Sequence, residues 1–340
     1  MNLPATPITD LAVHKRDKDL EVATQGRSFW ILDDLPVLHQ MTDDIAKADH
    51  HLFDPEDAYL YGGSSFFGAG PTSGANPDNG AVVFFTLDEA QEEEIKLEFL
   101  DMRGNTIQTF SSTEDARGRE VRESPLFFEE EDRTRPTVVP NKVGMNKFVW
   151  NLRCPGVTNL DGRQILWAGN TSGPMAVPGT YTVRMHIGDE MVAEQQFEVM
   201  KDPRLVDVTQ EDLVAQFELV QTINAKLDTT HKSINRIRMA TEEMKSMVAE
   251  IEGNEELTTR LKELSTAISE IEMELVQTKA EAIQDVLNFP IKLNNKLASL
   301  KSTVMTGYGR PTAQQYAVFE DLAGKVDVQL DKLNAIWNGE

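Results

Sequence analysis

Apolar and polar positions alternate in three short runs near the start of the chain, and a period of two is the pattern of half-covered β-strands. The runs predict strands over Ile8–Lys15, Asp19–Gln25 and Ser28–Asp34. Charged residues separate the first two runs, and the turn Gln25-Gly26-Arg27 separates the last two. Spacing this close predicts an antiparallel meander, the unit of a propeller blade or a sandwich. A blade needs four strands, and no later stretch repeats the pattern, so we expect the meander to be an incomplete piece of a larger assembly.

A second group of strand patterns predicts an Ig-like β-sandwich, because several short strands over a stretch of about 100 residues are typical of that fold. Residues 114–136 interrupt the group with a charge-rich stretch, which we interpret as an exposed acidic insertion. The predicted strands are Ala81–Leu87, Ile95–Leu100, Thr106–Phe110, Lys147–Arg153, Thr180–Ile187 and Met191–Val199.

The last third of the chain changes to the helical period. Thr209 with Asp212 predicts a capping box, and apolar residues then recur every three or four positions as far as Ile251. Gly253 ends this helix, and a second stripe runs from Leu257 to Leu275, so we expect an antiparallel coiled-coil hairpin. Two further helices follow, the last opening at Pro311-Thr312. The predicted stripe of the first helix contains Leu213, Val220, Ile223, Leu227, Ile234, Ile237, Met244, Val248 and Ile251.

These patterns together predict an α+β multidomain chain. Residues 1–40 form the incomplete blade strands, residues 41–80 a linker or loop, residues 81–203 the Ig-like sandwich, and residues 204–340 the helical bundle. The Gly- and Ser-rich stretch that ends at residue 80 favours a loop or a domain boundary.

Composition narrows the class of partner. The net charge is −23, which repels nucleic acid and anionic membranes, so we expect neither as a partner. No stretch reaches the roughly 18 consecutive apolar residues of a membrane span, and no signal peptide is evident. The single cysteine, Cys154, excludes an intrachain disulfide and a cysteine-rich zinc site.

Six motifs in one order carry a resemblance to a known family. The first, DLEVATQGRSFWILDD, is similar to the last-blade signature D-L-x-x-A-T-x-G-R-x-x-W-x-L-D-D of bacterial BNR-repeat, sortilin-like "glycosyl hydrolase" proteins. Gln25 departs from that pattern, because the family commonly has His there. The other motifs are Ala75-Asn76-Pro77-x-x-Gly80, Phe148–Arg153, Pro178–Val183, Asp202-Pro203-Arg204 and Pro311–Tyr316.

The resemblance covers the chain but only the C-terminal part of the family's architecture. It implies a non-catalytic module that braces an upstream β-propeller, either missing or on a separate chain, and presents a helical arm. It also implies a protein or carbohydrate ligand, and a secreted or periplasmic location for the full-length protein. The alternative is part of a sialidase-like glycosyl hydrolase whose catalytic blades are missing here. A third hypothesis is a standalone adaptor that uses the helical hairpin.

Candidate polar residues cluster at the predicted turn. Arg27 either binds a substrate carboxylate or, as we favour, locks the turn by bonding to carbonyl groups and to Asp33 or Asp34. Neither His50-His51 nor His231 has the neighbours of a metal or catalytic site, so we expect no metal and no cofactor. The acidic runs Glu92–Glu94 and Glu129–Asp132 are interpreted as solvated loop charges.

The hypotheses differ in what they expect of the surface. An incomplete blade predicts exposed apolar strand positions at Val22, Phe29, Ile31 and Leu32. A complete glycoside-active enzyme predicts a deep pocket with buried carboxyl groups of shifted pKa, built from Arg27 and the loop 62–80. Trp30, Trp150, Trp167 and Tyr181 are predicted to be core or turn anchors.

Overall fold

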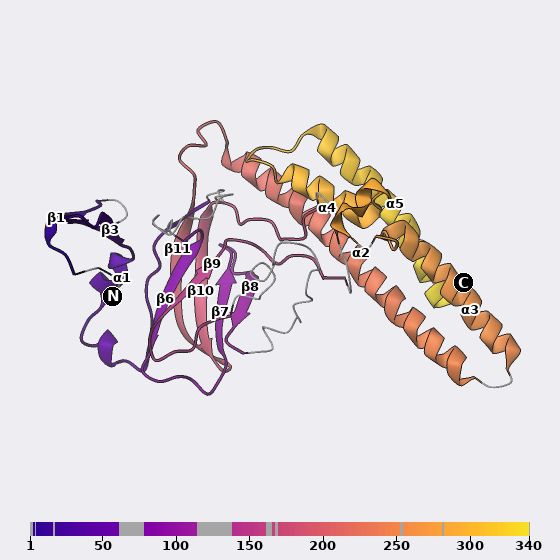
Figure 1. Ribbon diagram of the computed structural model, residues 1–340, viewed down its shortest axis with the longest axis horizontal. Coiled ribbons are helices and arrows are strands. Elements are labelled where there is room, and N and C mark those ends of the chain that lie inside the picture. The colour runs from indigo at the N-terminus through magenta and orange to yellow at the C-terminus, as the bar shows by residue number, and fades with distance from the viewer. Residues whose placement is uncertain are drawn as a thin grey trace. The chain divides into compact units, whose positions relative to one another are not determined.

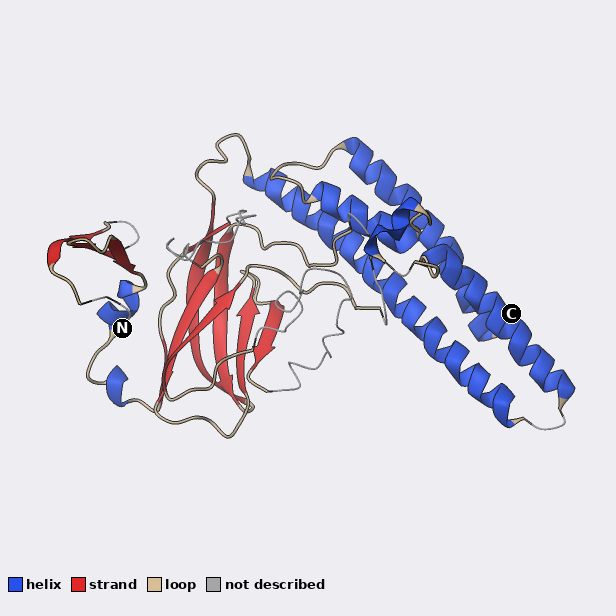
Figure 2. Cartoon of the chain, viewed as in Figure 1, coloured by secondary structure: helices blue, strands red, loops and turns tan. Residues whose placement is uncertain are grey.

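The computed structural model describes residues 3, 5–15, 18–60, 78–113, 138–160, 165–166, 169–251, 254–280 and 282–339. Within this part of the chain the fold is α+β, with five α-helices and three β-sheets (Figures 1 and 2). The chain forms two compact units. The β unit contains Met1–Leu152 and Pro178–Asp202, and the helical unit contains Arg153–Val177 and Pro203–Glu340. The predicted insertion 114–136 and the side chains of Trp167 and Glu129–Asp132 lie outside the described residues.

The predicted N-terminal meander is confirmed. Strands β1 (Ile8–Val13), β2 (Leu20–Thr24) and β3 (Phe29–Leu32) form a three-stranded sheet in that order, antiparallel throughout. Gly26 at φ +81° and Ser28 at φ +65° adopt the left-handed conformation that the tight second turn requires.

Two further sheets carry the remaining strands of the β unit (Figure 2). All neighbouring strands run antiparallel except β5 and β11, which are parallel. The smaller sheet has the order β4 (His50–Leu52), β6 (Ala81–Leu87), β9 (Gly144–Trp150). The larger has the order β5 (Ala58–Leu60), β11 (Glu190–Lys201), β10 (Gly179–Ile187), β7 (Ile95–Leu100), β8 (Thr106–Ser111).

Aromatic rings join the β4-β6-β9 sheet to the five-stranded sheet across a common core. Trp150 of β9 stacks on Phe99 of β7, with ring centroids 4.8 Å apart, and contacts Tyr181 of β10 at 5.6 Å. Phe148 and Phe197 complete the cluster, and all five side chains are buried. Strand β6 shows the underlying pattern, because every second residue is buried and the others are half-exposed. Trp150 and Tyr181 are therefore core anchors, as predicted.

The stretch predicted as a linker contributes regular structure. Helix α1 (Leu35–Gln40) and a 3₁₀ turn (Ile45–Lys47) follow the meander, and strands β4 and β5 each join one of the two sheets. The β-domain thus begins before residue 81. Strands of three residues are too short to show a period of two, so sheet pairing rather than sequence pattern reveals them.

Gly80 marks the point where β6 begins, and its backbone lies against β9. A Cβ atom there would lie 2.1 Å from the carbonyl oxygen of Trp150, and φ is +149°. We expect Gly80→Ala to lower the free energy of unfolding of the β unit by about 2 kcal/mol or more, measured by urea denaturation. Gly104→Ala is the control, because Gly104 has φ +80° but nothing within 4 Å of its Cβ position. Equal losses in both variants would contradict the close approach.

The helical unit contains α2 (Gln210–Glu250), α3 (Glu255–Leu275), a 3₁₀ helix (Ile283–Leu287), α4 (Leu293–Val304) and α5 (Ala313–Asn338). The capping box predicted at Thr209 is confirmed, because its hydroxyl accepts from the amide of Asp212 and the Asp212 carboxylate accepts from the amide of Thr209. Thr312 and Gln315 form a second one at the start of α5. Among the described residues, no helix is long and apolar enough to cross a bilayer.

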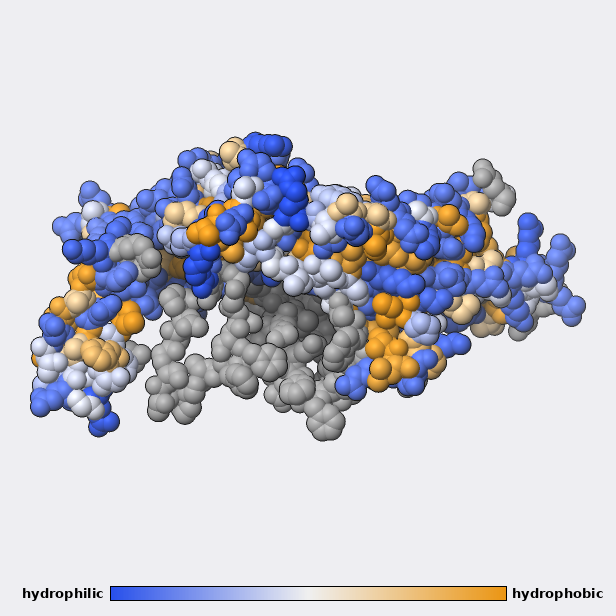
Figure 3. Space-filling view, turned by 90° about the horizontal axis from the view of Figure 1, so that it is seen from above, coloured by the Kyte–Doolittle hydropathy of each residue, from blue (hydrophilic) through white to orange (hydrophobic). Residues whose placement is uncertain are grey.

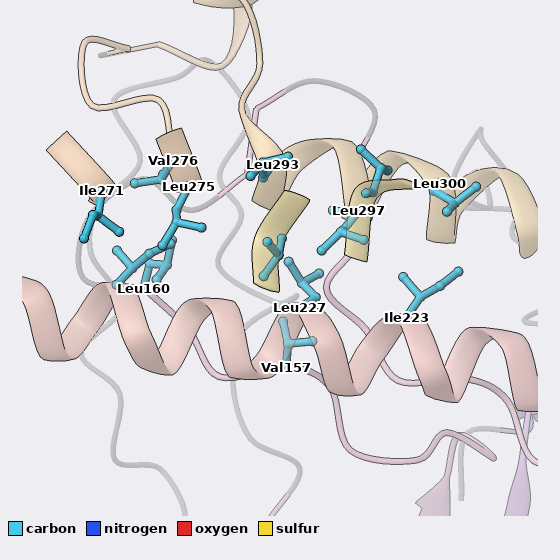
Figure 4. Packing of buried hydrophobic residues seen from close by; sticks show 14 of the residues in the cluster. Val157, Leu160, Ile223, Leu227, Ile271, Leu275, Val276, Leu293, Leu297 and Leu300 are labelled. Carbon is cyan, nitrogen blue, oxygen red and sulfur yellow. The ribbon is translucent and has the colours of Figure 1, made fainter. Parts of the chain in front are cut away.

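The apolar stripe of α2 forms the centre of the helical core. Seven of the nine predicted stripe residues, from Leu213 to Met244, are buried, whereas Val248 and Ile251 near the helix end are half-buried. Figure 4 shows the stripe beside leucines of α4 and two residues from outside the helices, Val157 and Leu160. The range predicted as the Ig-like domain, residues 81–203, thus includes a segment that packs in the helical core.

Candidate interaction surface

The N-terminal meander exposes apolar side chains on both of its faces. The register places Leu11 opposite Val22 and Val22 opposite Trp30, so these residues share one face. Phe29 and Ile31 lie on the other face, where they pair with β2 at Ala23 and Glu21. Figure 3 shows apolar surface on this part of the chain, at the left of the view.

The exposed fractions show which positions lack cover. Phe29 is 79% exposed, Ile31 61% and Leu32 50%, which confirms three of the four predicted exposed positions. The prediction for Val22 is wrong, because it is only 8% exposed. Val22 lies in the central strand, where neighbours on both sides shield it, whereas the other three belong to an outer strand.

The outer strands of the meander also leave backbone groups open. Among the described strands, β1 and β3 each pair with β2 alone, and all six residues of β1 are exposed. A free edge beside exposed apolar side chains is a template for pairing with another strand. Leu11 and Val13 on β1 are 59% and 56% exposed.

The predicted polar residues lie at opposite ends of β3. Arg27 is exposed in the turn before the strand, where its carbonyl oxygen accepts from Trp30 Nε1 at 2.9 Å. Asp33 and Asp34 follow the strand, and among the described residues no hydrogen bond joins either to Arg27. The locking role of Arg27 stays a prediction, whereas Trp30 is the turn anchor that the pattern indicated.

Asp34 engages a different cation. Its Oδ2 lies 2.7 Å from Lys147 Nζ on β9, and Asp78 Oδ2 lies 2.9 Å from the same nitrogen. Burial opposes the charged form of Lys147, but hydrogen bonds to the two carboxylates outweigh it and raise the pKa of the ammonium. The ammonium also lies 5.2 Å from the centre of the Phe84 ring. Asp34 is therefore part of an ion-pair network with Lys147 and Asp78.

The histidines and acidic runs show no catalytic arrangement among the described residues. His51 stacks edge-on to Phe53, and burial followed by the charge of His50 lowers the pKa of its imidazole. Glu94 accepts hydrogen bonds from Ser111 and Thr113, and the bond from Ser111 is the main cause of its lowered pKa. No group of three or more metal-ligating side chains is present in the described part of the chain.

A buried polar cluster in the helical unit escaped the sequence analysis. Between β9 and β10, residues 153–160, 165–166 and 169–177 belong to the helical unit, and polar side chains of α2 and α4 bind their backbone. Lys301 Nζ donates to the Ser172 carbonyl oxygen at 2.8 Å, and the Asn295 side chain accepts from the amide of Leu166 at 2.6 Å. Further bonds of this kind join Asn224 to Pro155, Asp228 to Thr158, His231 to Thr158 and Asn235 to Asn159.

Two titratable groups of this cluster are fully buried. His231 is 0% exposed, its Nδ1 lies 2.7 Å from the Thr158 carbonyl oxygen, and burial lowers its pKa. Lys301 is also 0% exposed, and burial followed by the charge of Arg153 lowers its pKa to about 8. Asn224 Oδ1 is its second acceptor, at 2.8 Å. These groups tie the segment to the helices.

Comparisons with protein-family models, with curated proteins and with solved structures found no match for this chain.

Proposed function

We propose that this chain is a non-catalytic structural module. Its meander would complete a β-propeller of the BNR-repeat, sortilin-like type, and its helical unit would act as an interaction arm. One observation carries the proposal: the meander exposes large apolar side chains on both faces and a free strand edge. Exposure of this apolar surface to water is unfavourable, so a partner surface that covers it would stabilise the meander.

The two apolar faces favour a propeller over a sandwich as the assembly. A sandwich layer buries one face and leaves the other in water. A propeller blade is covered on both faces by its neighbours and contains four strands. The meander has three strands, and Phe29 and Leu11 lie on opposite faces. A fourth strand added to the free edge of β1 would complete a blade.

The aromatic core supports an Ig-like domain as the brace of this assembly. The sheet orders β4-β6-β9 and β5-β11-β10-β7-β8 support an Ig-type arrangement, because β6 and β9 share one sheet and β7, β10 and β11 share the other. Tyr181 lies at the start of β10, the strand that corresponds to the one carrying the Ig tyrosine corner. Trp150 lies on β9 rather than on the strand that carries the Ig tryptophan.

The carboxylates give less support to the hypothesis that this chain is a complete glycoside-active enzyme. A glycosidase needs one carboxyl group whose pKa is raised by its pocket. Glu94, Asp101, Asp212 and Asp228 all have pKa values shifted downward. Their hydrogen bonds favour the charged form, which suits turns and ion pairs.

We expect the purified full chain to self-associate and to bind the dye ANS through the meander. A chain carrying Phe29→Asp and Ile31→Lys should lose most of the dye signal and become monomeric, because both substitutions place charge on one apolar face. Light scattering after size exclusion and a dye titration measure the two effects. Met102→Lys, at a 77% exposed residue in the β7–β8 turn, is the matched control and should change neither.

Removal of residues 1–40 provides the second arm of the test. We expect the truncated chain to be monomeric, silent to the dye and still folded by circular dichroism. A full chain that is already monomeric and dye-silent, but loses order on truncation, would show that the meander is covered within the chain. That result would overturn the proposal.

A further inference from the structure

The helical unit carries a groove of about 840 Å³ on its surface. Its walls are the C-terminal halves of α3 and α5 and the loop that joins α3 to α4. Small and apolar side chains from all three elements line it: Ala267, Ile271, Ala335, Ile336, Phe289 and Pro290.

The loop wall is braced by its own hydrogen bonds. Gln277 Nε2 donates to the carbonyl oxygen of Pro290 at 2.9 Å, and Gln277 Oε1 accepts from the amide of Lys279 at 3.1 Å. Lys292 Nζ donates to Glu274 Oε1 at 3.1 Å, which links the end of the loop to α3. These bonds fix the loop wall, so binding need not first order the loop.

The residues that line this groove have a net positive charge, whereas the whole chain is strongly negative. The protein has 56 acidic and 33 basic residues, yet three lysines and two glutamates line the groove, which leaves one positive charge. Lys292 neutralises Glu274. Among the described residues, neither Lys279 nor Lys332 has an ion-pair partner, so both ammonium groups are available at the rim.

We propose that the groove binds a small molecule with an aliphatic body and one carboxylate group, a binding site independent of the function proposed above. The apolar floor would take the aliphatic body, and Lys279 and Lys332 would bind the carboxylate through charge-assisted hydrogen bonds. The volume falls within the roughly 300–1,000 Å³ of small-molecule sites. A cationic amphiphile would meet the same ammonium groups and be repelled.

Calorimetric titration of the full chain tests the charge preference. The probes are dodecanoate and dodecyltrimethylammonium, which carry alkyl tails of nearly the same length and opposite charges, both below their critical micelle concentrations. We expect saturable binding of one dodecanoate per chain and at least about tenfold weaker binding of the cation. Equal affinity for the two probes, or no saturable binding of dodecanoate, would overturn the proposal.

Substitutions locate the site. Lys279→Glu with Lys332→Glu should weaken dodecanoate binding about tenfold or more, because both charges at the rim are reversed. Lys262→Glu with Lys325→Glu is the matched control, since it makes the same change of net charge at exposed positions of α3 and α5 outside the groove. The control should bind as the parent chain does, and equal weakening in both would contradict the site.

The floor is tested separately. Ala267→Phe places a ring in the groove and should weaken dodecanoate binding without changing the circular dichroism spectrum. Ala335→Leu fills the opposite wall and serves if the first variant does not fold. Unchanged binding in a folded floor variant would place the dodecanoate elsewhere and overturn the proposal.

Discussion

Replacement of Trp150 by alanine is expected to reduce the free energy of unfolding of the β unit by about 3–5 kcal/mol. The side chain is 0% exposed, and its ring contacts Phe99, Tyr181 and Phe197 from the opposite sheet. Alanine would leave a cavity at the point where the two sheets meet, and the surrounding rings belong to paired strands that can move little to fill it. A loss of this size is a large part of the 5–15 kcal/mol that stabilises an ordinary domain.

Hydrogen exchange followed by mass spectrometry measures this effect unit by unit. Peptides from β6, β7 and β10 should lose protection in Trp150→Ala. Trp150→Phe keeps a ring against Phe99, so its strand peptides should lose less than half as much protection as those of Trp150→Ala. Trp337→Ala is the matched control and should leave the protection of the β strands unchanged. Trp337 is a half-buried residue of α5, in the helical unit, whose ring lies against the guanidinium of Arg236. Full protection of the β strands in Trp150→Ala would show that the aromatic cluster does not hold the sheets together.

The strands and helices with clear periodicity were predictable from the sequence. The meander, the six later strands and the capped helix α2 appear with boundaries shifted by a few residues at most. Their side-chain period matches the face that each element buries, which is local information. Strands β4 and β5 were not predictable, because three residues show no period and their pairing partners lie far along the chain.

The candidate surface was predictable in part. An apolar outer strand such as β3 exposes Phe29 and Ile31 wherever its sheet lacks a neighbour, so the pattern alone indicated the exposure. The pairing of Asp34 with Lys147 was not predictable, because 113 positions separate the two residues. The groove on α3 and α5 depends in the same way on how helices from different parts of the sequence meet.

The buried polar residues of α4 show most clearly why the polar cluster could not be predicted from the sequence. Asn294, Asn295 and Lys301 are buried, although helix patterns normally place such residues in water. The reason is the neighbour that α4 has. An extended segment offers backbone carbonyl and amide groups that need partners, and buried polar side chains satisfy them. Nothing in the local sequence of α4 indicates that its neighbour is an extended segment rather than an apolar helix.

Among these residues, substitution of Lys301 should lower the free energy of unfolding of the helical unit most. The size of this loss should depend on pH. Lys301→Ala is expected to lower the free energy of unfolding of the helical unit by about 4 kcal/mol at pH 9. It removes a packed aliphatic stem and leaves the Ser172 carbonyl and the Asn224 side chain without a donor. Lys301→Met keeps most of the stem volume and loses only the donors and the charge, so it isolates the contribution of the ammonium group.

The direction of the pH effect follows from the lowered pKa of Lys301, about 8 in the folded chain against 10.5 for an ordinary lysine. Below pH 8 both states carry the proton, and the folded state bears the full cost of a buried charge. Between pH 8 and 10.5 the folded chain releases the proton while the unfolded chain keeps it, so stability rises with pH across this window. The free energy of unfolding of the parent chain should rise on the order of 3 kcal/mol relative to Lys301→Met across this window.

Urea denaturation of both proteins from pH 7 to 10 measures the difference. Lys296→Met, at an exposed lysine of α4, is the control, and the parent chain should show no such gain relative to it. A difference between parent and Lys301→Met that stays constant with pH would mean that the buried amine does not change its charge on folding, and that the cluster stabilises the segment by hydrogen bonding alone.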